Sequence, residues 1–372
     1  MRAVIVGGGI IGLTTAIALR RQGIEAMIHE QAPAIRAAGA GLGLWANAVA
    51  VFDELGLGEQ VRAIGRPAEM FFRNHAGEVI HPSGYSDDNH RYLLVHRAKL
   101  NDLLAEAVGP DHIRLDSRLV GYDETDTGVT AHFGDGTRAG ADLLVGADGV
   151  YSIVRSLLLP GSEAVEHKGH HAWRAVVPPP AGTTIDRSVI VLGEERTRGG
   201  YVPTADGTVY WLVNQFGVDP LHGTPKEQAA ERAAFLDTTG WNPALPALIA
   251  STPDEQVLHN QVMLVPPLAR WVSQRVVLAR RFRSRTFPAH HRGCVAGCGG
   301  RAVAGPAAHL LRWRGGRAGR LRSRPDPALP EGQRVGQDGG GLCDAGGIRR
   351  PLCGLQTLDA QPVAALTTWR TG

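Results

Sequence analysis

The strongest constraint on the fold lies in the first thirty residues. A short apolar run, Arg2–Val6, leads into Gly7-Gly8-Gly9-Ile10-Ile11-Gly12, and an amphipathic stretch then continues to Gly23. A second apolar run, Ile24–His29, stops at Glu30. Strand, glycine turn, helix, strand and acid in this order are typical of a βαβ unit that binds a dinucleotide, with the acid accepting a hydrogen bond from a ribose hydroxyl.

Each glycine of the turn has an expected role. Gly7 makes the tight turn, Gly9 lets the backbone approach a pyrophosphate, and Gly12 lets helix and strand pack closely. The helix that opens with Ile10 and Ile11 offers free N–H groups and a partial positive charge to that anion. A glycine-rich chain can match the glycine spacing by chance, but the matching strand, helix and acid favour a cofactor site.

Two further segments are candidates for the same site. The run from Ala38 to Ala48, which contains Gly41, has small residues that would let a loop lie against a flat ligand, although an ordinary glycine-rich loop has the same composition. Apolar spacing predicts a helix over Arg97–Val108 that ends at Gly109. Arg97 lies in its first turn, where a cation opposes the helix dipole, so it either faces an anion or is solvated.

A β-meander is predicted next, over Ile113–Tyr122, Val129–Phe133 and Ala141–Val145. It ends in Gly146-Ala147-Asp148-Gly149, which precedes a predicted helix with Ser152 and Arg155 in its first turn. An Asp-Gly pair after a buried strand is usually only a turn. The polar opening of the following helix favours a polar pocket that includes Asp148 and Gly149.

The character of the chain changes after residue 165. Alternating strands and an Asp206-Gly207 hairpin turn predict a mostly antiparallel sheet over 166–267, with a helix that starts at a capping box, Thr224–Glu227. The apolar run Arg275–Ala279 is predicted to return to the first sheet as a parallel strand. We therefore expect an α/β protein with a cofactor domain, 1–165 and 268–279, and an inserted sheet domain, 166–267.

Together these motifs resemble the FAD-dependent aromatic monooxygenases of the para-hydroxybenzoate hydroxylase fold, over about residues 1–279. The resemblance implies a Rossmann-like FAD-binding domain with an inserted antiparallel substrate domain. Asp148 and Gly149 resemble the family's "DG" motif, which contacts both FAD and NAD(P)H. The implied cofactors are FAD and NADH or NADPH, and the implied reaction is hydroxylation of a small aromatic molecule by O₂ through a flavin C4a-hydroperoxide.

Within the family, Thr197–Pro203 followed by Tyr210 is similar to the substrate segment of urate hydroxylase and of salicylate-hydroxylase-like enzymes. The resemblance makes Arg198 and Tyr210 the candidate catalytic residues. A phenol or urate-like oxyanion needs a fixed cation, and a tyrosine hydroxyl can hold or relay its proton. Alternatively, both are strand residues common to the wider group.

The last quarter of the chain has a different composition. Arg280–Gly372 contains 16 Arg, no Lys and 5 acidic residues, a difference of +11, whereas the other 23 basic and 31 acidic residues differ by −8. The family motif that begins Gly-Asp is missing after Ala279, but reading Arg280-Arg281-Phe282 in the next frame permits Gly-Asp. We therefore hypothesise a frameshift at about Ala279, which leaves the segment 280–372 poorly ordered and the activity of this chain impaired.

Other functions are less well supported by the sequence. A flavin halogenase or reductase on the same fold, a plain NAD dehydrogenase, an inactive flavoprotein and an arginine-tail binding protein are the alternatives. Cys294 and Cys298 with His290 and His291 match no standard zinc spacing, so no metal is expected. No nucleic acid partner is expected, and no membrane partner is expected because no run of about 20 apolar residues is present. We expect a cytoplasmic location and a monomer or homodimer.

Overall fold

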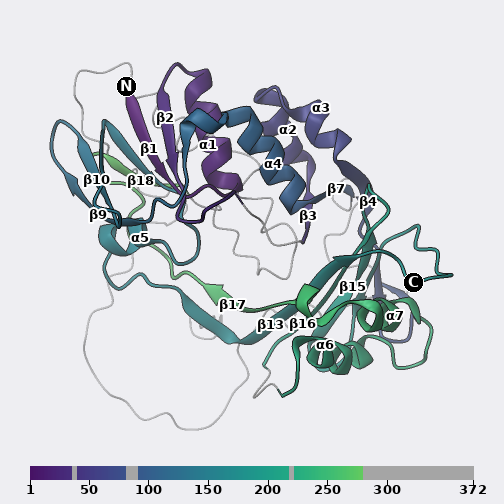
Figure 1. Cartoon of the computed structure of the whole chain (residues 1–372). Coiled ribbons are helices and arrows are strands. Elements are labelled where there is room, and N and C mark those ends of the chain that lie inside the picture. The colour runs from purple at the N-terminus through teal and green to yellow at the C-terminus, as the bar shows by residue number, and fades with distance from the viewer. Residues whose placement is uncertain (36–39, 81–90, 218–221, 280–372) are drawn as a thin grey trace, which may run out of the picture.

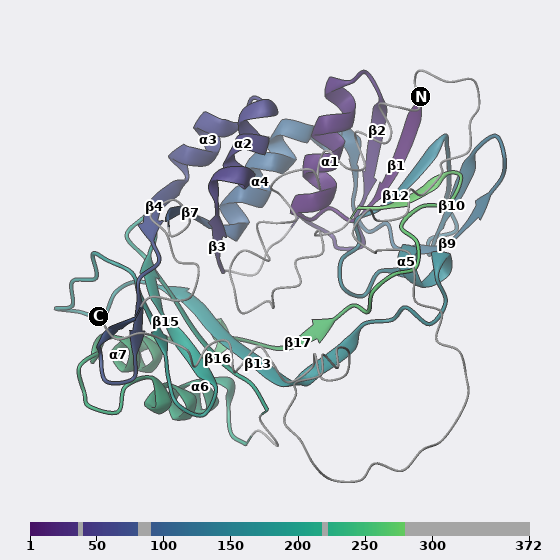
Figure 2. The same cartoon turned by 180° about the vertical axis from the view of Figure 1, so that it is seen from behind.

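The computed structural model describes residues 1–35, 40–80, 91–217 and 222–279. The segment 280–372 therefore lies outside the described residues, and with it the sequence predicted to be out of frame and the group of His290, His291, Cys294 and Cys298. A parallel sheet with its helices occupies one end of the molecule, and a larger sheet with two helices occupies the other (Figures 1 and 2). None of the helices in the described ranges has the length and apolar character needed to cross a membrane.

The first sheet contains five parallel strands in the order β18-β12-β1-β2-β8. Their bounds are β1 Arg2–Val6, β2 Glu25–His29, β8 Ile113–Arg114, β12 Leu143–Gly146 and β18 Val276–Leu278. The predicted return of the chain after Arg275 is confirmed, because β18 pairs with β12 in parallel. The carboxyl ends of β1 and β12 thus lie side by side, at the glycine turn.

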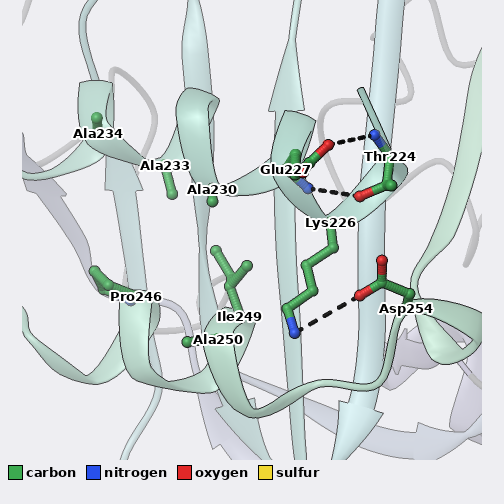
Figure 3. Close-up of a pocket in the computed structure, with 10 residues that line it drawn as sticks. All are labelled: Thr224, Lys226, Glu227, Ala230, Ala233, Ala234, Pro246, Ile249, Ala250 and Asp254. Atoms are coloured by element: carbon green, nitrogen blue, oxygen red, sulfur yellow. Dashed lines mark hydrogen bonds and ion pairs between the residues drawn. The ribbon is translucent and has the colours of Figure 1, made fainter. Parts of the chain in front are cut away.

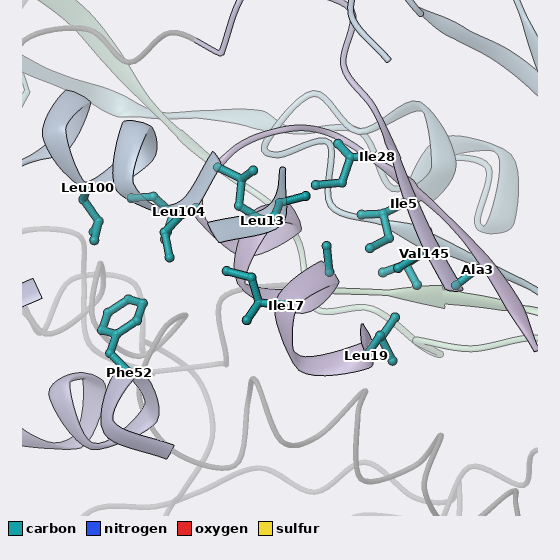
Figure 4. Close-up of a cluster of buried hydrophobic side chains, with 14 of the residues drawn as sticks. Ala3, Ile5, Leu13, Ile17, Leu19, Ile28, Phe52, Leu100, Leu104 and Val145 are labelled. Carbon is teal, nitrogen blue, oxygen red and sulfur yellow. The ribbon is translucent and has the colours of Figure 1, made fainter. Parts of the chain in front are cut away.

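Four helices lie on one side of this sheet, and the first of them packs directly on its strands (Figure 1). They are α1 Ile10–Arg21, α2 Ala46–Glu54, α3 Gly58–Ala63 and α4 Arg97–Val108. Their apolar side chains meet those of the strands in a buried cluster that includes Ile5, Leu13, Phe52 and Leu104 (Figure 4). α4 has the predicted bounds, and Gly109 follows it with φ 87°, a conformation that favours glycine.

The meander differs from the prediction at both of its ends. It consists of β9 Leu119–Glu124, β10 Val129–Phe133 and β11 Arg138–Ala141. The predicted strand Ile113–Tyr122 is wrong, because Asp116 turns the chain at φ 52° and its first part joins the parallel sheet as β8. The predicted strand Ala141–Val145 is likewise split at Asp142, whose carboxylate accepts a hydrogen bond from the Arg2 N–H at 2.7 Å.

The larger sheet contains seven strands in the order β17-β13-β16-β15-β14-β5-β6. Five of them come from the predicted insertion: β13 Val165–Val177, β14 Val189–Leu192, β15 Thr197–Pro203, β16 Val209–Gln215 and β17 Leu258–Leu264. The other two come from the N-terminal segment: β5 Phe72–Asn74 and β6 Val79–Ile80. The sheet is therefore not built from residues 166–267 alone.

Side-chain alternation gives this sheet two different faces. One face, with Trp173 and Trp211, is covered by α6 Pro225–Ala233 and α7 Ala244–Ser251. The predicted capping box at the start of α6 is present. The other face, with Tyr210, packs against a small sheet of β3 Gly41–Leu44, β4 Gly65–Glu69 and β7 Arg91–His96. This second face, called the inner face below, brings the two halves of the molecule together.

The remaining elements are short. They are α5 Ile153–Leu158 and three turns of 3₁₀ helix, Pro110–His112, Ala234–Leu236 and Asp254–Gln256.

Candidate active site

The glycine turn has the geometry that a bound pyrophosphate requires. Gly7 has φ 107°, and a Cβ there would lie 2.5 Å from the Ala147 carbonyl oxygen. A Cβ on Gly12 would lie 1.9 Å from the Gly7 carbonyl oxygen, so helix and turn touch at that point. A Cβ on Gly9 would meet no atom of the described residues within 4 Å. The backbone at Gly9 is therefore open to a ligand while its two neighbours in the motif are tightly packed.

The N-terminus of α1 complements that opening. Its first residues are Ile10 and Ile11, and it has neither a side-chain N-cap nor an acidic residue in its first turn. N–H groups that lack a capping side chain are available to an anion, which the helix dipole also favours. The turn thus fits the pyrophosphate of a dinucleotide such as FAD.

Glu30 lies beside the same turn. Its carboxylate accepts hydrogen bonds from the Gly8 N–H at 2.6 Å and from the Ala32 N–H at 2.9 Å. An ionised carboxylate has about four acceptor positions, so it retains capacity for a ribose hydroxyl. The sequence did not predict that Glu30 also fixes the backbone of the glycine turn.

Gly41 and Arg97 lie where the two halves of the molecule meet. A Cβ on Gly41 would lie 2.5 Å from the Tyr210 ring, so this glycine is what allows β3 to contact the inner face. The Arg97 N–H donates to the Ala40 carbonyl at 2.9 Å, while its side chain is exposed. The backbone of Arg97 is therefore held by Ala40, the residue before Gly41.

The Asp148 carboxylate caps α5. It accepts hydrogen bonds from the Ser152 hydroxyl at 2.5 Å, the Ile153 N–H at 2.8 Å and the Val154 N–H at 3.1 Å. Gly149 follows with φ 80°. The loop packs on the glycine turn, because a Cβ on Gly7 would come within 3.0 Å of the Asp148 Cα. Asp148 therefore orders a loop next to the expected cofactor position.

Arg155 also holds this loop, a role that the sequence did not predict. Its side chain is 3% exposed, and its guanidinium donates to the carbonyls of Ser162, Gly149 and Val150. Burial lowers its pKa below the ordinary range. Three carbonyl acceptors stabilise the buried cation, so Arg155 is a structural residue of the loop.

Arg198 and Tyr210 project from neighbouring strands onto the inner face. Tyr210 is the cross-strand partner of Val202, four residues along β15 from Arg198. At about 3.3 Å per residue, that offset is roughly 13 Å between backbones, and the buried Leu212 lies on the same face between them. Both residues are buried.

The Arg198 guanidinium lacks a neutralising partner. Its Nε has no hydrogen-bond partner within the described chain, and no acidic side chain of those residues offsets its charge. Burial lowers its pKa to about 10, and the nearby Tyr210 acts in the opposite direction. A buried cation without an anion is unfavourable, so the side chain fits the negative group of a ligand.

A separate groove lies on the outer side of the larger sheet. It encloses about 710 Å³ between α6 and α7 and is lined mainly by small apolar side chains, with the Lys226–Asp254 ion pair at one end (Figure 3). The sheet separates this groove from Arg198. Among the described residues, no cluster of three or more His, Cys, Asp or Glu could hold a metal ion.

This chain is similar to known proteins in sequence and in fold. A family model described as an FAD binding domain matches residues 1–252. The chain belongs to the FAD-dependent monooxygenases. It is 31% identical over 293 residues to the aurachin C monooxygenase/isomerase of Stigmatella aurantiaca, and this alignment covers 75% of this chain and 73% of that protein.

Two further comparisons support the same family. The FAD-dependent urate hydroxylase of Mycolicibacterium vanbaalenii is 28% identical over 298 residues, covering 77% of this chain and 74% of that enzyme. The structure of Klebsiella pneumoniae HpxO complexed with FAD and uric acid has a TM-score of 0.67 at 23% identity, covering 85% and 80% of the two chains. The predicted fold class and FAD as cofactor are confirmed.

Proposed function

We propose that this monooxygenase hydroxylates a small aromatic or heteroaromatic molecule that binds as an anion. The observation that carries the proposal is the buried Arg198, whose charge no acidic group of the described chain offsets. Relatives named for urate and 6-hydroxynicotinate act on acidic heteroaromatic rings, which agrees with this electrostatic argument. O₂ as co-substrate, a cytoplasmic location and a monomeric or homodimeric state are part of the same proposal.

The residues of the glycine turn would hold FAD. The N–H groups of Ile10 and Ile11 and the open backbone at Gly9 would bind the pyrophosphate, and Glu30 would accept from the ribose. Bound there and reduced by NAD(P)H, FAD would supply the electrons that activate O₂, and O₂ itself would provide the oxygen atom transferred to the ring. Arg97, Asp148 and Gly149 would border the same cofactor.

The protein's own contribution is to bind and orient the ring. Arg198 would fix the anionic group by charge and hydrogen bonds. The Tyr210 hydroxyl would hold or relay the proton of a ring hydroxyl. The packing of β3 against the inner face would exclude water from the ring.

Replacing Arg198 by methionine tests the proposal. Loss of an ionic hydrogen bond costs about 1.5–3 kcal/mol, so binding of an anionic ring should weaken roughly 10- to 100-fold. Removing an unpaired buried charge should at the same time stabilise the fold by about 1 kcal/mol or more. If Arg198→Met instead lowers Tm and leaves binding of urate and 6-hydroxynicotinate unchanged, Arg198 has a structural role and the proposal is wrong.

We also propose that the segment after Ala279 is translated out of frame. The support is in the sequence, where the next frame permits Gly-Asp directly after β18. A chain with the frame restored should bind FAD more tightly than this one and turn over substrate faster. Sequencing the DNA provides the direct test: a confirmed open frame for Arg280–Gly372 in the gene, together with unchanged FAD affinity after restoration, would rule the frameshift out.

A further inference from the structure

We propose that Asn214 is a second substrate-recognition residue beside Arg198, and that the pair selects a ring with an anionic group and a neutral lactam edge. A lactam edge presents an N–H and a C=O side by side, as hydroxylated nitrogen heterocycles do in their keto form, whereas hydroxybenzoates have no ring N–H. The inference rests on the proposed function, because it concerns the same site.

The sheet register places Asn214 directly beside Arg198. The two residues are cross-strand partners on β16 and β15, within seven consecutive pairs that show no irregularity. Directly opposite side chains on neighbouring strands project from the same face, with Cβ atoms about 4.5–5.5 Å apart. The Asn214 amide and the Arg198 side chain therefore border the same space.

The packing of β16 identifies that space as part of the inner face. Tyr210 and Leu212 belong to the buried cluster of the inner face, whereas Trp211 and Val213 belong to the cluster under α6 and α7. Side chains alternate along a strand, so Asn214 lies on the side of Tyr210 and Leu212. The inner face thus carries a polar amide next to the buried cation.

The hydrogen-bonding capacity of the Asn214 amide is not used by the described chain. The side chain is half-buried and makes no hydrogen bond with any of the described residues. Its neighbour in the same row on β13, Ala172, offers only a methyl group. The Asn260 amide, at the edge of the sheet on the same face, is engaged, because it accepts from the Arg174 guanidinium at 2.7 Å. The Asn214 amide is therefore available to a ligand held by Arg198.

The chemistry of the amide determines which second group the ligand must carry. A carboxamide offers N–H donors and a carbonyl acceptor and has no charge. It does not offset the Arg198 cation, so the negative charge must come from the ligand. A lactam edge can accept from Asn214 Nδ2 and donate to Asn214 Oδ1 at the same time. A phenol can accept from Nδ2 but has no ring N–H for Oδ1.

Three related probes separate the two interactions. 6-Hydroxynicotinate has a carboxylate and a lactam edge, 4-hydroxybenzoate has the carboxylate but no ring nitrogen, and 6-hydroxynicotinamide has the lactam edge but no carboxylate. We would measure Kd for each by isothermal titration calorimetry on the FAD-loaded full chain and on its Asn214→Leu and Asn214→Asp variants. Asn260→Leu is the matched control, since it removes an amide from the same face three strands, or about 14 Å, from Arg198. Tm of each variant reports structural effects.

One neutral hydrogen bond changes affinity by about two- to tenfold, so wild type should prefer 6-hydroxynicotinate to 4-hydroxybenzoate by roughly fivefold. Asn214→Leu should abolish that preference and keep the preference for 6-hydroxynicotinate over its amide. Asn260→Leu should keep both preferences.

Asn214→Asp tests the proximity to Arg198 independently of the lactam. The added carboxylate would lie opposite Arg198 and offset its charge, so the preference for 6-hydroxynicotinate over its amide should fall at least about fivefold. An unchanged lactam preference in folded Asn214→Leu, an equal loss in Asn260→Leu, or an unchanged acid-over-amide preference in Asn214→Asp overturns the role of Asn214. If wild type binds the acid and its amide equally, the proposed function fails first.

Discussion

Replacing Gly9 with serine adds a side chain where the glycine turn faces open space. The backbone at Gly9 has φ −78° and ψ 179°, which any residue can adopt, and within the described part of the chain no atom lies within 4 Å of a Cβ placed there. Serine is also a favourable N-cap, so the free energy of unfolding should change by no more than about 0.5 kcal/mol or rise slightly. The added side chain would occupy the space where the pyrophosphate approaches, and we expect FAD affinity to fall at least about tenfold, or 1.4 kcal/mol.

Gly12→Ala, in contrast, should lower the stability of the fold. Its Cβ would lie 1.9 Å from the Gly7 carbonyl oxygen, a backbone atom that cannot move freely. Overpacking of this kind costs about 1–3 kcal/mol, which corresponds to a Tm decrease of roughly 2–12 °C in a protein of this size. Gly140→Ser is the control, because a Cβ at Gly140 also has no neighbour within 4 Å among the residues that the structure describes.

The assay combines differential scanning fluorimetry with titration of FAD by fluorescence quenching. We expect Gly9→Ser to keep the wild-type Tm and to bind FAD more weakly. Gly12→Ala should have a lower Tm, and Gly140→Ser should change neither the Tm nor the FAD affinity. Wild-type FAD affinity in Gly9→Ser, or a wild-type Tm in Gly12→Ala, would refute the assignment of these two glycines.

Three further predictions follow from the contacts of individual side chains. Asp148→Ala removes three hydrogen bonds at the start of α5 and should lower stability by about 1–3 kcal/mol, measured by urea unfolding. Gly41→Ala would push on the Tyr210 ring 2.5 Å away, so it should weaken binding of an aromatic ligand in calorimetry. His29 and His170 have pKa values lowered to about 4 and about 3, mainly by burial. Both stay neutral when folded and protonate near 6.5 when unfolded, so Tm should be highest above pH 6.5 and fall towards pH 4, less steeply in His29→Phe.

Local sequence signals predicted much of the fold. The glycine turn, the α4 helix and the Thr224 capping box depend on residues within a few positions of one another, and the structure confirms each of them. The two meander strands were wrong because single residues, Asp116 and Asp142, break apparently continuous runs. A strand can change sheets at such a residue without a change in hydrophobic pattern.

The candidate site was harder to predict, because its residues meet only through sheet register. The pairing of β15 with β16 places Arg198 and Tyr210 on one face, and no local pattern contains that information. The contact of Gly41 with Tyr210 joins residues 169 positions apart, for the same reason. The buried role of Arg155 also depends on carbonyls that approach only in the folded loop.

The central claim is that residues 1–279 contain the FAD site, and the absorption spectrum of the purified full-length chain between about 350 and 500 nm tests it most directly. The spectrum would be recorded with and without added FAD, after removal of unbound flavin, alongside Gly9→Ser. We predict a protein-bound flavin spectrum for the wild-type chain and its loss in Gly9→Ser. A folded wild-type chain that stays colourless after incubation with FAD would contradict the account.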